Sequence, residues 1–408
     1  MARESTGSRG HAKGEIRPAN LAIALAEIRR RKSVSRGELT GALGLGRTTV
    51  FELLNQLVQL GLITDRTDSG SGQVGRPSMI VAPNDSVVAF TVNPESDALT
   101  VGRVTMGGEI TDRRRIPTRT PVSPSTAASL AADAMREMLE TSQPGERVGG
   151  IGVAVPGQVI RESGHVLVAP RLGWRDADFA GMLGEITGLP VWADNNARLV
   201  TEAEHRLGEA SEFHDFIYIF SGAGGVGGGI VLDDRLLLGS NGFAGELGHL
   251  RVNDSPELDY LGLSGTFEAL VRRDDLLAVL REGEAEASVA DLTDGEIDLL
   301  VQRSERIGLP ALAARQLRIA GAVSGNLANL FNPQAIVLGG FLGSLYRRFP
   351  AEFDQVLSEV GLPTVLRSLV IRSSVAGPEM AMYGAAELVF GKVEADPLGF
   401  VFRRPTLR

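Results

Sequence analysis

The pattern of apolar and polar residues near the start of the chain predicts a series of short helices. Apolar residues recur at helical spacing from 21 to 28, and this helix ends in the basic run 29–32. Ser35 and Glu38 have the spacing of a capping box and begin a second, shorter helix that ends at Leu43. The polar residues 1–17 show no apolar period and predict a disordered basic arm.

A third helix is predicted from about 47 to 60, because apolar residues again share one face, and Gly61 ends it. Two short strands at 62–64 and 79–81 then flank a Gly/Ser-rich loop that carries Gly-Arg-Pro at 75–77. Helices in this order, followed by two strands around a loop, are typical of a winged helix-turn-helix. We therefore expect a DNA-binding domain at 18–84, the alternative being a helical module that binds proteins.

The remainder of the chain alternates strands and helices. Strands are expected at 87–92, 99–105 and 109–116, followed by a helix at 127–139 and a strand at 148–155. A chain of 408 residues exceeds one ordinary core, so this α/β region forms a domain separate from the head.

Charge is divided unevenly between these parts. Residues 1–80 hold 12 Lys/Arg against 7 Asp/Glu, a net charge of +5, whereas the remainder holds 29 against 43, a net charge of −14. A basic head on an acidic body indicates that only the head meets a polyanion. In a helix-turn-helix the start of the last helix faces the major groove, and a cationic wing suits the minor groove. The candidate DNA-contacting residues are Ser35, Arg36, Arg47, Thr48, Thr49, Glu52, Asn55 and Arg76.

Composition narrows the class of protein further. The chain has no cysteine, which excludes disulfides and thiolate metal ligands. No apolar run approaches the roughly 20 residues that a membrane helix needs, and the polar N-terminus does not match a secretory signal. We expect a cytoplasmic protein with no membrane partner.

Two glycine-rich blocks carry the strongest motif. Residues 221–230 read Ser-Gly-Ala-Gly-Gly-Val-Gly-Gly-Gly-Ile and predict a turn whose N–H groups crowd around a phosphate or another ligand. Residues 242–249 read Gly-Phe-Ala-Gly-Glu-Leu-Gly-His. Their spacing, with matching pieces at 156–157, 172–174, 329–333 and 337–340, resembles the ROK family of sugar kinases and sugar-responsive repressors.

The resemblance implies a two-lobed, actin-like (ribonuclease-H-like) kinase fold behind the winged head. It places the first lobe at 85–195, completed by a helix at about 378–392. The second lobe is expected at 196–377 and a tail at 393–408.

The resemblance also implies that kinase chemistry is lost. Kinases of this family carry Asp-x-Gly-Gly-Thr at the first hairpin, where residues 91–95 read Thr-Val-Asn-Pro-Glu. Pro94 has no N–H to offer a phosphate, and Glu95 would repel one by roughly 1 kcal/mol in water. Asn196 stands at the position of the catalytic Asp, and an amide cannot accept a proton from an alcohol. Asp194 could replace it only if the local register slipped, so no catalytic residue is assigned.

The sugar-holding residues of the family are kept, by contrast. Asn195, Glu246, His249 and Glu268 are those whose counterparts bind sugar hydroxyls, and Gly157 would let the backbone approach the ring. The plainer alternative is that Glu246 and His249 only brace each other. Arg171, where the family often has Asn, is either a surface arginine or a cation favouring an acidic or phosphorylated sugar. The predicted effector-binding residues are Gly157, Arg171, Asn195, Asn196, Glu246, His249 and Glu268.

The structural zinc of the family is predicted to be absent. Its three cysteine positions hold Asp259, Leu261 and Thr266, and leucine cannot ligate a metal. Our hypothesis is that Leu261 and Leu263 replace the metal by packing. No cofactor is expected.

The function implied is a DNA-binding regulator, most simply a repressor, that responds to a sugar-like effector. Members of the family associate through the body, so a homodimer or homotetramer reading a palindromic operator is expected. The rival is an active ATP-dependent sugar kinase with an added DNA-binding head, favoured by the glycine-rich blocks. A DNA binder that needs no effector is the third possibility.

Overall fold

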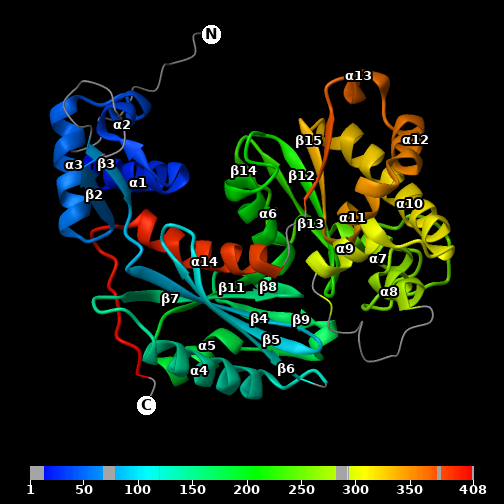
Figure 1. Ribbon diagram of the computed structural model, residues 1–408, viewed down its shortest axis with the longest axis horizontal. Helices are drawn as coiled ribbons and strands as arrows, with labels where there is room; N and C mark the ends of the chain where they lie inside the picture. The colour runs from blue at the N-terminus through cyan, green and yellow to red at the C-terminus, as the bar shows by residue number, and fades with distance from the viewer. Residues whose placement is uncertain are drawn as a thin grey trace, which may run out of the picture.

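The computed structural model describes residues 13–67, 79–118, 120–281, 292, 294–374 and 378–406 (Figure 1). Its N-terminal head consists of three helices and a small antiparallel sheet of order β1-β3-β2. The elements are α1 (Lys13–Arg31), β1 (Val34–Ser35), α2 (Arg36–Leu43), α3 (Arg47–Gln59), β2 (Ile63–Thr67) and β3 (Met79–Pro83). The predicted capping box of α2 is present, since Ser35 Oγ accepts from the Glu38 N–H at 3.2 Å and the Glu38 carboxylate accepts from the Ser35 N–H at 2.9 Å.

One boundary of the head was predicted wrongly. Helix α1 begins at Lys13, so residues 13–17 are helical, whereas we expected them in a disordered arm. Lysine, glutamate and arginine are good helix formers, so the helix needs no apolar period there. The side chain of Arg17 also donates to Gln56 Oε1 on α3 at 3.0 Å. Residues 1–12 of the expected arm, and the wing with Arg76, lie outside the described residues.

Each of the two lobes behind the head is built on a five-stranded sheet. In the first lobe the order is β11-β7-β4-β5-β6, in which three antiparallel strands are followed by two parallel ones. A smaller sheet, β10-β9-β8, lies beside it. The elements are β4 (Val87–Pro94), β5 (Ala98–Thr105), β6 (Ile110–Pro117), α4 (Pro124–Glu140), β7 (Arg147–Val155), β8 (Gln158–Ile160), β9 (His165–Ala169), β10 (Trp174–Ala177), α5 (Phe179–Thr187) and β11 (Val191–Asn195).

The second lobe repeats this topology. Its order β14-β13-β12-β15-β16 again sets an antiparallel meander beside two parallel strands. This repetition confirms the predicted two-lobed fold. The elements are α6 (Asn196–Leu207), β12 (Phe216–Gly222), β13 (Gly225–Leu232), β14 (Arg235–Leu236), α7 (Phe267–Leu270), α8 (Arg273–Arg281), α9 (Asp294–Arg303), α10 (Gly308–Phe331), β15 (Ala335–Gly339), α11 (Gly340–Arg348), α12 (Pro350–Val360), α13 (Pro363–Leu366) and β16 (Val370–Ser373).

The C-terminal helix α14 (Pro378–Ala395) joins the head to both lobes. It packs on β4 and β7 of the first lobe, on α6 of the second, and on α1 of the head (Figure 1). Buried side chains of the head, such as Leu25 and Ile28, share one hydrophobic cluster with Val389 and Phe390 of α14. The head is therefore docked on the body through a continuous apolar core.

A buried ion cluster crosses this joint. Arg29 of α1 has 4% of its side chain exposed, and it binds Glu387 of α14 at 2.7 Å and also Glu394. Arg206 of α6 approaches the same two carboxylates at 2.9 and 3.5 Å. Two arginines from different parts of the chain thus share two glutamates of α14.

No helix in the described part of the chain combines the length and the apolar character that a bilayer crossing requires.

Candidate functional site

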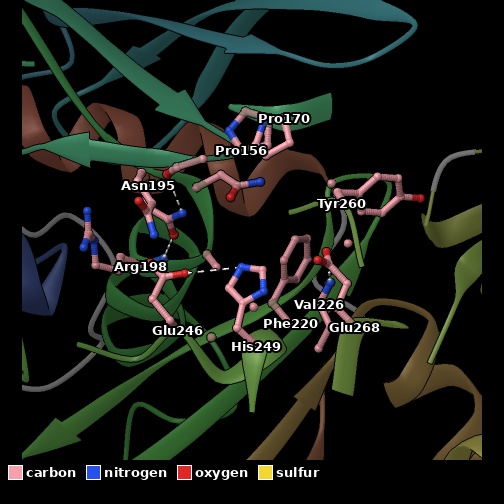
Figure 2. Close-up of a pocket in the computed structure, with 18 of the residues that line it drawn as sticks. Pro156, Pro170, Asn195, Arg198, Phe220, Val226, Glu246, His249, Tyr260 and Glu268 are labelled. Carbon is pink, nitrogen blue, oxygen red and sulfur yellow. Dashed lines mark hydrogen bonds and ion pairs between the residues drawn. The ribbon is translucent and has the colours of Figure 1, made fainter. Parts of the chain in front are cut away.

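A pocket lies where the two lobes meet, and it gathers every predicted effector-binding residue. Gly157, Arg171, Asn195, Asn196, Glu246, His249 and Glu268 all line it. Figure 2 shows Asn195, Glu246, His249 and Glu268 facing one space from different elements. The sequence therefore predicted correctly that these residues lie together.

The two asparagines at the start of α6 have different surroundings. Asn195 is the N-cap of α6, where its Oδ1 accepts from the Arg198 N–H at 3.1 Å, and its Nδ2 donates to the Gly157 carbonyl at 2.9 Å. One N–H and one lone pair of its amide remain for a ligand. Among the described residues, the Asn196 side chain has no hydrogen-bond partner.

Asp194 does not face the pocket. Its side chain is fully buried, and it accepts from Arg198 Nε at 2.9 Å and lies 3.3 Å from Arg161. Two guanidinium groups thus hold this carboxylate away from the pocket. The geometry gives no support to Asp194 as a substitute proton acceptor.

Gly157 has a packing reason for its lack of a side chain. A Cβ at this position would lie 2.4 Å from the Val168 carbonyl and 2.7 Å from Ala169 Cα, both in β9. The close approach of this hairpin by itself requires the glycine, and its predicted approach to a ligand stays a prediction.

Glu246 and His249 face the pocket as a loosely coupled pair. His249 Nε2 lies 3.9 Å from Glu246 Oε2, which is too long for a direct hydrogen bond (Figure 2). Burial raises the pKa of Glu246, although the neighbouring His249 and Arg198 oppose this. Because the two groups do not satisfy each other, both keep polar atoms available for a ligand's hydroxyls.

The glycine-rich block forms a strand instead of the predicted phosphate-holding turn. Only residues 223–224 turn, and the glycines from Gly225 onward lie in β13. A Cβ at Gly225, where φ is +108°, would lie 1.7 Å from Glu268 Oε1, so the glycine lets this carboxylate reach the strand. Glu268 accepts from the Val226 N–H at 3.3 Å. Burial raises the pKa of Glu268, which His249 and Arg171 oppose.

Asp259 forms the centre of a hydrogen-bonded node below the pocket. Its Oδ2 accepts from His249 Nδ1 at 2.9 Å and from Thr266 Oγ1 at 3.0 Å. Its Oδ1 accepts from the N–H groups of Leu261 and Leu263, both at 2.9 Å. Burial alone would raise the pKa of Asp259, but the hydrogen bonds led by that of His249 leave it lowered. A proton on His249 Nδ1 leaves Nε2 of the neutral ring as an acceptor toward the pocket.

This node argues against a structural zinc site. Among the described residues, His249, Asp259 and Glu268 can bring ligand atoms within 4.8 Å of one another. However, each Asp259 oxygen already accepts hydrogen bonds from two donors. Leu261 has no ligand atom, and a structural zinc needs four ligands. Our packing hypothesis was wrong, because Leu261 and Leu263 are 37% and 49% exposed. The Asp259 carboxylate stabilises the loop by hydrogen bonds to the backbone of Leu261 and Leu263, in place of the apolar packing that we expected.

Arg171 lies at the mouth of the pocket. Its guanidinium stacks 3.7 Å from the centre of the Tyr260 ring and also donates to the Tyr260 hydroxyl. It lines a second cavity as well, a chamber of about 530 Å³ that Glu95 and Asn196 also border. The side chain is therefore held at the junction of pocket and chamber, in contrast to a freely solvated surface arginine.

The DNA-binding candidates lie on two helices of the head. Arg47, Thr48, Thr49 and Glu52 are exposed on the first half of α3, and Asn55 on the same helix is partly buried. Ser35 caps α2, and Arg36 of α2 binds Asp65 of β2. The described candidates thus lie at the start of α2 and on α3.

Sequence reasoning missed several residues that complete the site. Arg198 orients Asp194 and donates to the Gly242 carbonyl, while Tyr260 and Phe220 form apolar walls of the pocket. The Arg161 guanidinium lies 3.3 Å from the Asp194 carboxylate and 3.0 Å from that of Glu202. Arg198 lies four positions after Asp194, a spacing that could have pointed to it, whereas Arg161, Phe220 and Tyr260 come from separate segments with no such signal.

The chain is similar to known proteins over most of its length. The profile described as the ROK family matches residues 96–392. The xylose repressor of Caldicellulosiruptor bescii is 25% identical over 368 residues, which cover 85% of this chain and 92% of that protein.

Two solved structures are also similar. A ROK family transcriptional regulator, homolog of the E. coli MLC protein, has a TM-score of 0.74 at 24% identity and covers 93% of this chain and 97% of its own. A ROK family glucokinase from Streptomyces griseus, in complex with glucose and AMPPNP, has a TM-score of 0.58 at 26% identity and covers 74% and 98%. The regulator thus matches more of this chain than the glucokinase does.

Proposed function

The chain belongs to the ROK family, and from this premise we propose that the protein is a transcriptional repressor whose head binds DNA and whose interlobe pocket binds a sugar-like effector. The observation that carries the proposal is the pocket, in which amide, carboxylate and imidazole groups converge in a body that carries a helix-turn-helix head. Xylose repressors and a ROK regulator among the similar proteins support it.

The proposed effector is a small polyhydroxylated molecule. Glu246, Glu268 and Asn195 offer acceptors and a donor that can each engage adjacent hydroxyls. Arg171 at the mouth supports an effector that also carries a carboxylate or phosphate. In this proposal the effector lies between the lobes, so that its binding energy favours the closed form.

The route from pocket to head follows contacts of the fold. Asn195 caps α6, α6 packs against α14, and Glu387 of α14 binds Arg29 in the head. Closure of the lobes that moved α6 would therefore move α14 and the docked head. In a homodimer or homotetramer this would change the spacing of paired heads on a palindromic operator. A difference of a few kcal/mol between the two states suffices.

The first experiment measures DNA binding with and without sugars. A duplex selected from a random library is footprinted at two salt concentrations against a panel of sugars and sugar phosphates. We expect protection that persists at the higher salt, unlike purely phosphate-driven binding, and that changes with one class of sugar. Glu246→Gln should weaken the sugar response about tenfold or more, because it removes a charged hydrogen-bonding partner.

Glu257→Gln is the matched control, because Glu257 is exposed outside the pocket, and its response should equal that of the unchanged protein. Equal DNA binding by a truncated chain that lacks residues 1–84 would refute the role of the head. A sugar response that Glu246→Gln leaves intact would refute the proposed pocket.

We also propose that the protein is not a kinase. Asn196 lines the pocket with an amide, which cannot accept the proton of a sugar hydroxyl. Pro94 borders the neighbouring chamber, where it has no N–H to donate to a phosphate. A coupled assay with ATP and hexoses should show no turnover above background, and Asn196→Asp alone should restore none. Turnover that disappears in Asn196→Ala would favour the kinase instead.

A further inference from the structure

One aromatic residue stands out on the polar face of the third helix in the head. Thr48, Phe51, Glu52 and Asn55 follow i, i+3, i+4, i+7 spacing and share one face of α3. The opposite face carries the buried residues Val50, Leu53, Leu54 and Leu57. The Phe51 side chain is therefore directed away from the core of the head, and the residue is 50% exposed.

The Phe51 ring is held by a charged neighbour. The guanidinium carbon of Arg36 lies 5.2 Å from the ring centre, within the range of a cation–π contact. Arg36 in turn donates to Asp65 of β2. Residues from α2 and from the sheet thus restrain a half-exposed ring in the middle of the surface that would enter the groove.

We propose that Phe51 is a specificity-determining residue that contacts the C5-methyl group of a thymine in the major groove. This inference rests on the proposed function of the head as a DNA reader. A phenyl ring has no hydrogen-bonding group, so it cannot pair with the polar edges of guanine, adenine or cytosine. The thymine methyl is the apolar feature that the major groove offers to such a side chain.

The contact also distinguishes thymine from cytosine. Cytosine carries only a hydrogen on C5, so it offers the ring no methyl group, and its amino group stands where thymine has O4. Phe51 would thus select thymine by apolar contact with its methyl group, while Arg36 keeps the ring in place.

The experiment uses the full chain and a duplex that it selects from a random-sequence library. Each thymine of one half-site is replaced in turn by deoxyuridine, which removes only the methyl group. For the unchanged protein we expect one thymine whose replacement weakens binding about fourfold, the value for one buried methyl. In Phe51→Ala that sensitivity should disappear, while the effects at other thymines stay the same.

Two further variants complete the design. Ile23→Ala is the matched control, because Ile23 is a 56% exposed apolar residue on α1, a different helix of the head. It should keep the full thymine sensitivity. Phe51→Leu retains an apolar side chain and should keep part of it, which also guards against a folding defect in Phe51→Ala.

The outcomes separate this inference from the proposed function. If the library yields no sequence that binds better than a scrambled duplex, the DNA-reading function itself fails, and this inference fails with it. If a sequence is selected but the same thymine remains sensitive in Phe51→Ala, only the inference is overturned, and the ring is an ordinary exposed side chain.

Discussion

Replacing Arg29 by methionine is expected to lower the free energy of unfolding by about 3–5 kcal/mol. Methionine keeps much of the volume of the side chain but leaves Glu387 and Glu394 without the guanidinium that binds both. A buried carboxylate without a partner is costly, and Arg206 alone cannot compensate two of them. Urea denaturation at neutral pH, followed by circular dichroism, measures the loss.

Arg30→Met is the control for this substitution. The Arg30 side chain is 61% exposed, and its ion-pair partner among the described residues is Glu27 on its own helix. Such a pair contributes less than about 1 kcal/mol, so the variant should unfold almost as the unchanged protein does. Equal stability losses in the two variants would show that the ion cluster of α14 does not hold the head.

The stabilisation by Arg29 should also depend on pH. Burial raises the pKa of Glu387, but the charges of Arg29 and Arg206 outweigh this and leave it lowered. A carboxylate with a lowered pKa in the folded state contributes stability above its unfolded pKa, near 4.3, and loses it as the pH falls through the folded pKa. The difference between Arg29→Met and the unchanged protein should be constant from pH 8 to 6 and shrink below about pH 4.

The Arg29 joint also bears on regulation. The head is docked on the helix that contacts both lobes, so a loosened joint would separate effector binding from DNA binding. In Arg29→Met we therefore expect the sugar to bind with unchanged affinity but to alter DNA binding less. A stable variant with a full sugar response would contradict the proposed route through α14.

Replacing Asp259 by asparagine is expected to disrupt the pocket without any change in metal content. The carboxylate accepts from His249, Thr266 and two backbone N–H groups. Asparagine has one acceptor oxygen. Its NH2 group would therefore face the two donors that bind the other oxygen of Asp259. We expect a loss of about 2–3 kcal/mol in stability and an effector affinity at least tenfold weaker, because His249 loses the partner that orients it.

Metal analysis and a control variant test this role for Asp259. The purified protein should contain far less than one zinc per chain, and a chelator should leave its thermal unfolding unchanged. Asp254→Asn is the control, because the Asp254 side chain is 99% exposed and, within the part of the chain that the structure describes, pairs with Arg251 alone. Near-stoichiometric zinc that disappears in Asp259→Asn would show that the node is a metal site instead.

Local pattern was sufficient for most of the fold. Helices α2 and α3 and the first strands of the body follow from apolar period and capping, which depend on residues a few positions apart. Motif spacing was sufficient to predict which residues line the pocket, because the resemblance carries their placement with it. The same local reasoning placed the start of α1 too late, since polar helix formers give no apolar signal.

What the sequence determined by itself was therefore the order of the first elements, the paired lobes and seven of the residues that line the pocket. Tertiary structure alone decided how the head is held, because Arg29 and Glu394 are 365 positions apart. Tertiary structure also brought Glu268 against the glycines of β13. It made Asp259 the acceptor of hydrogen bonds from four donors. Hydrogen bonds and ion pairs depend on which surfaces meet, and that information is absent from any pattern of nearby residues.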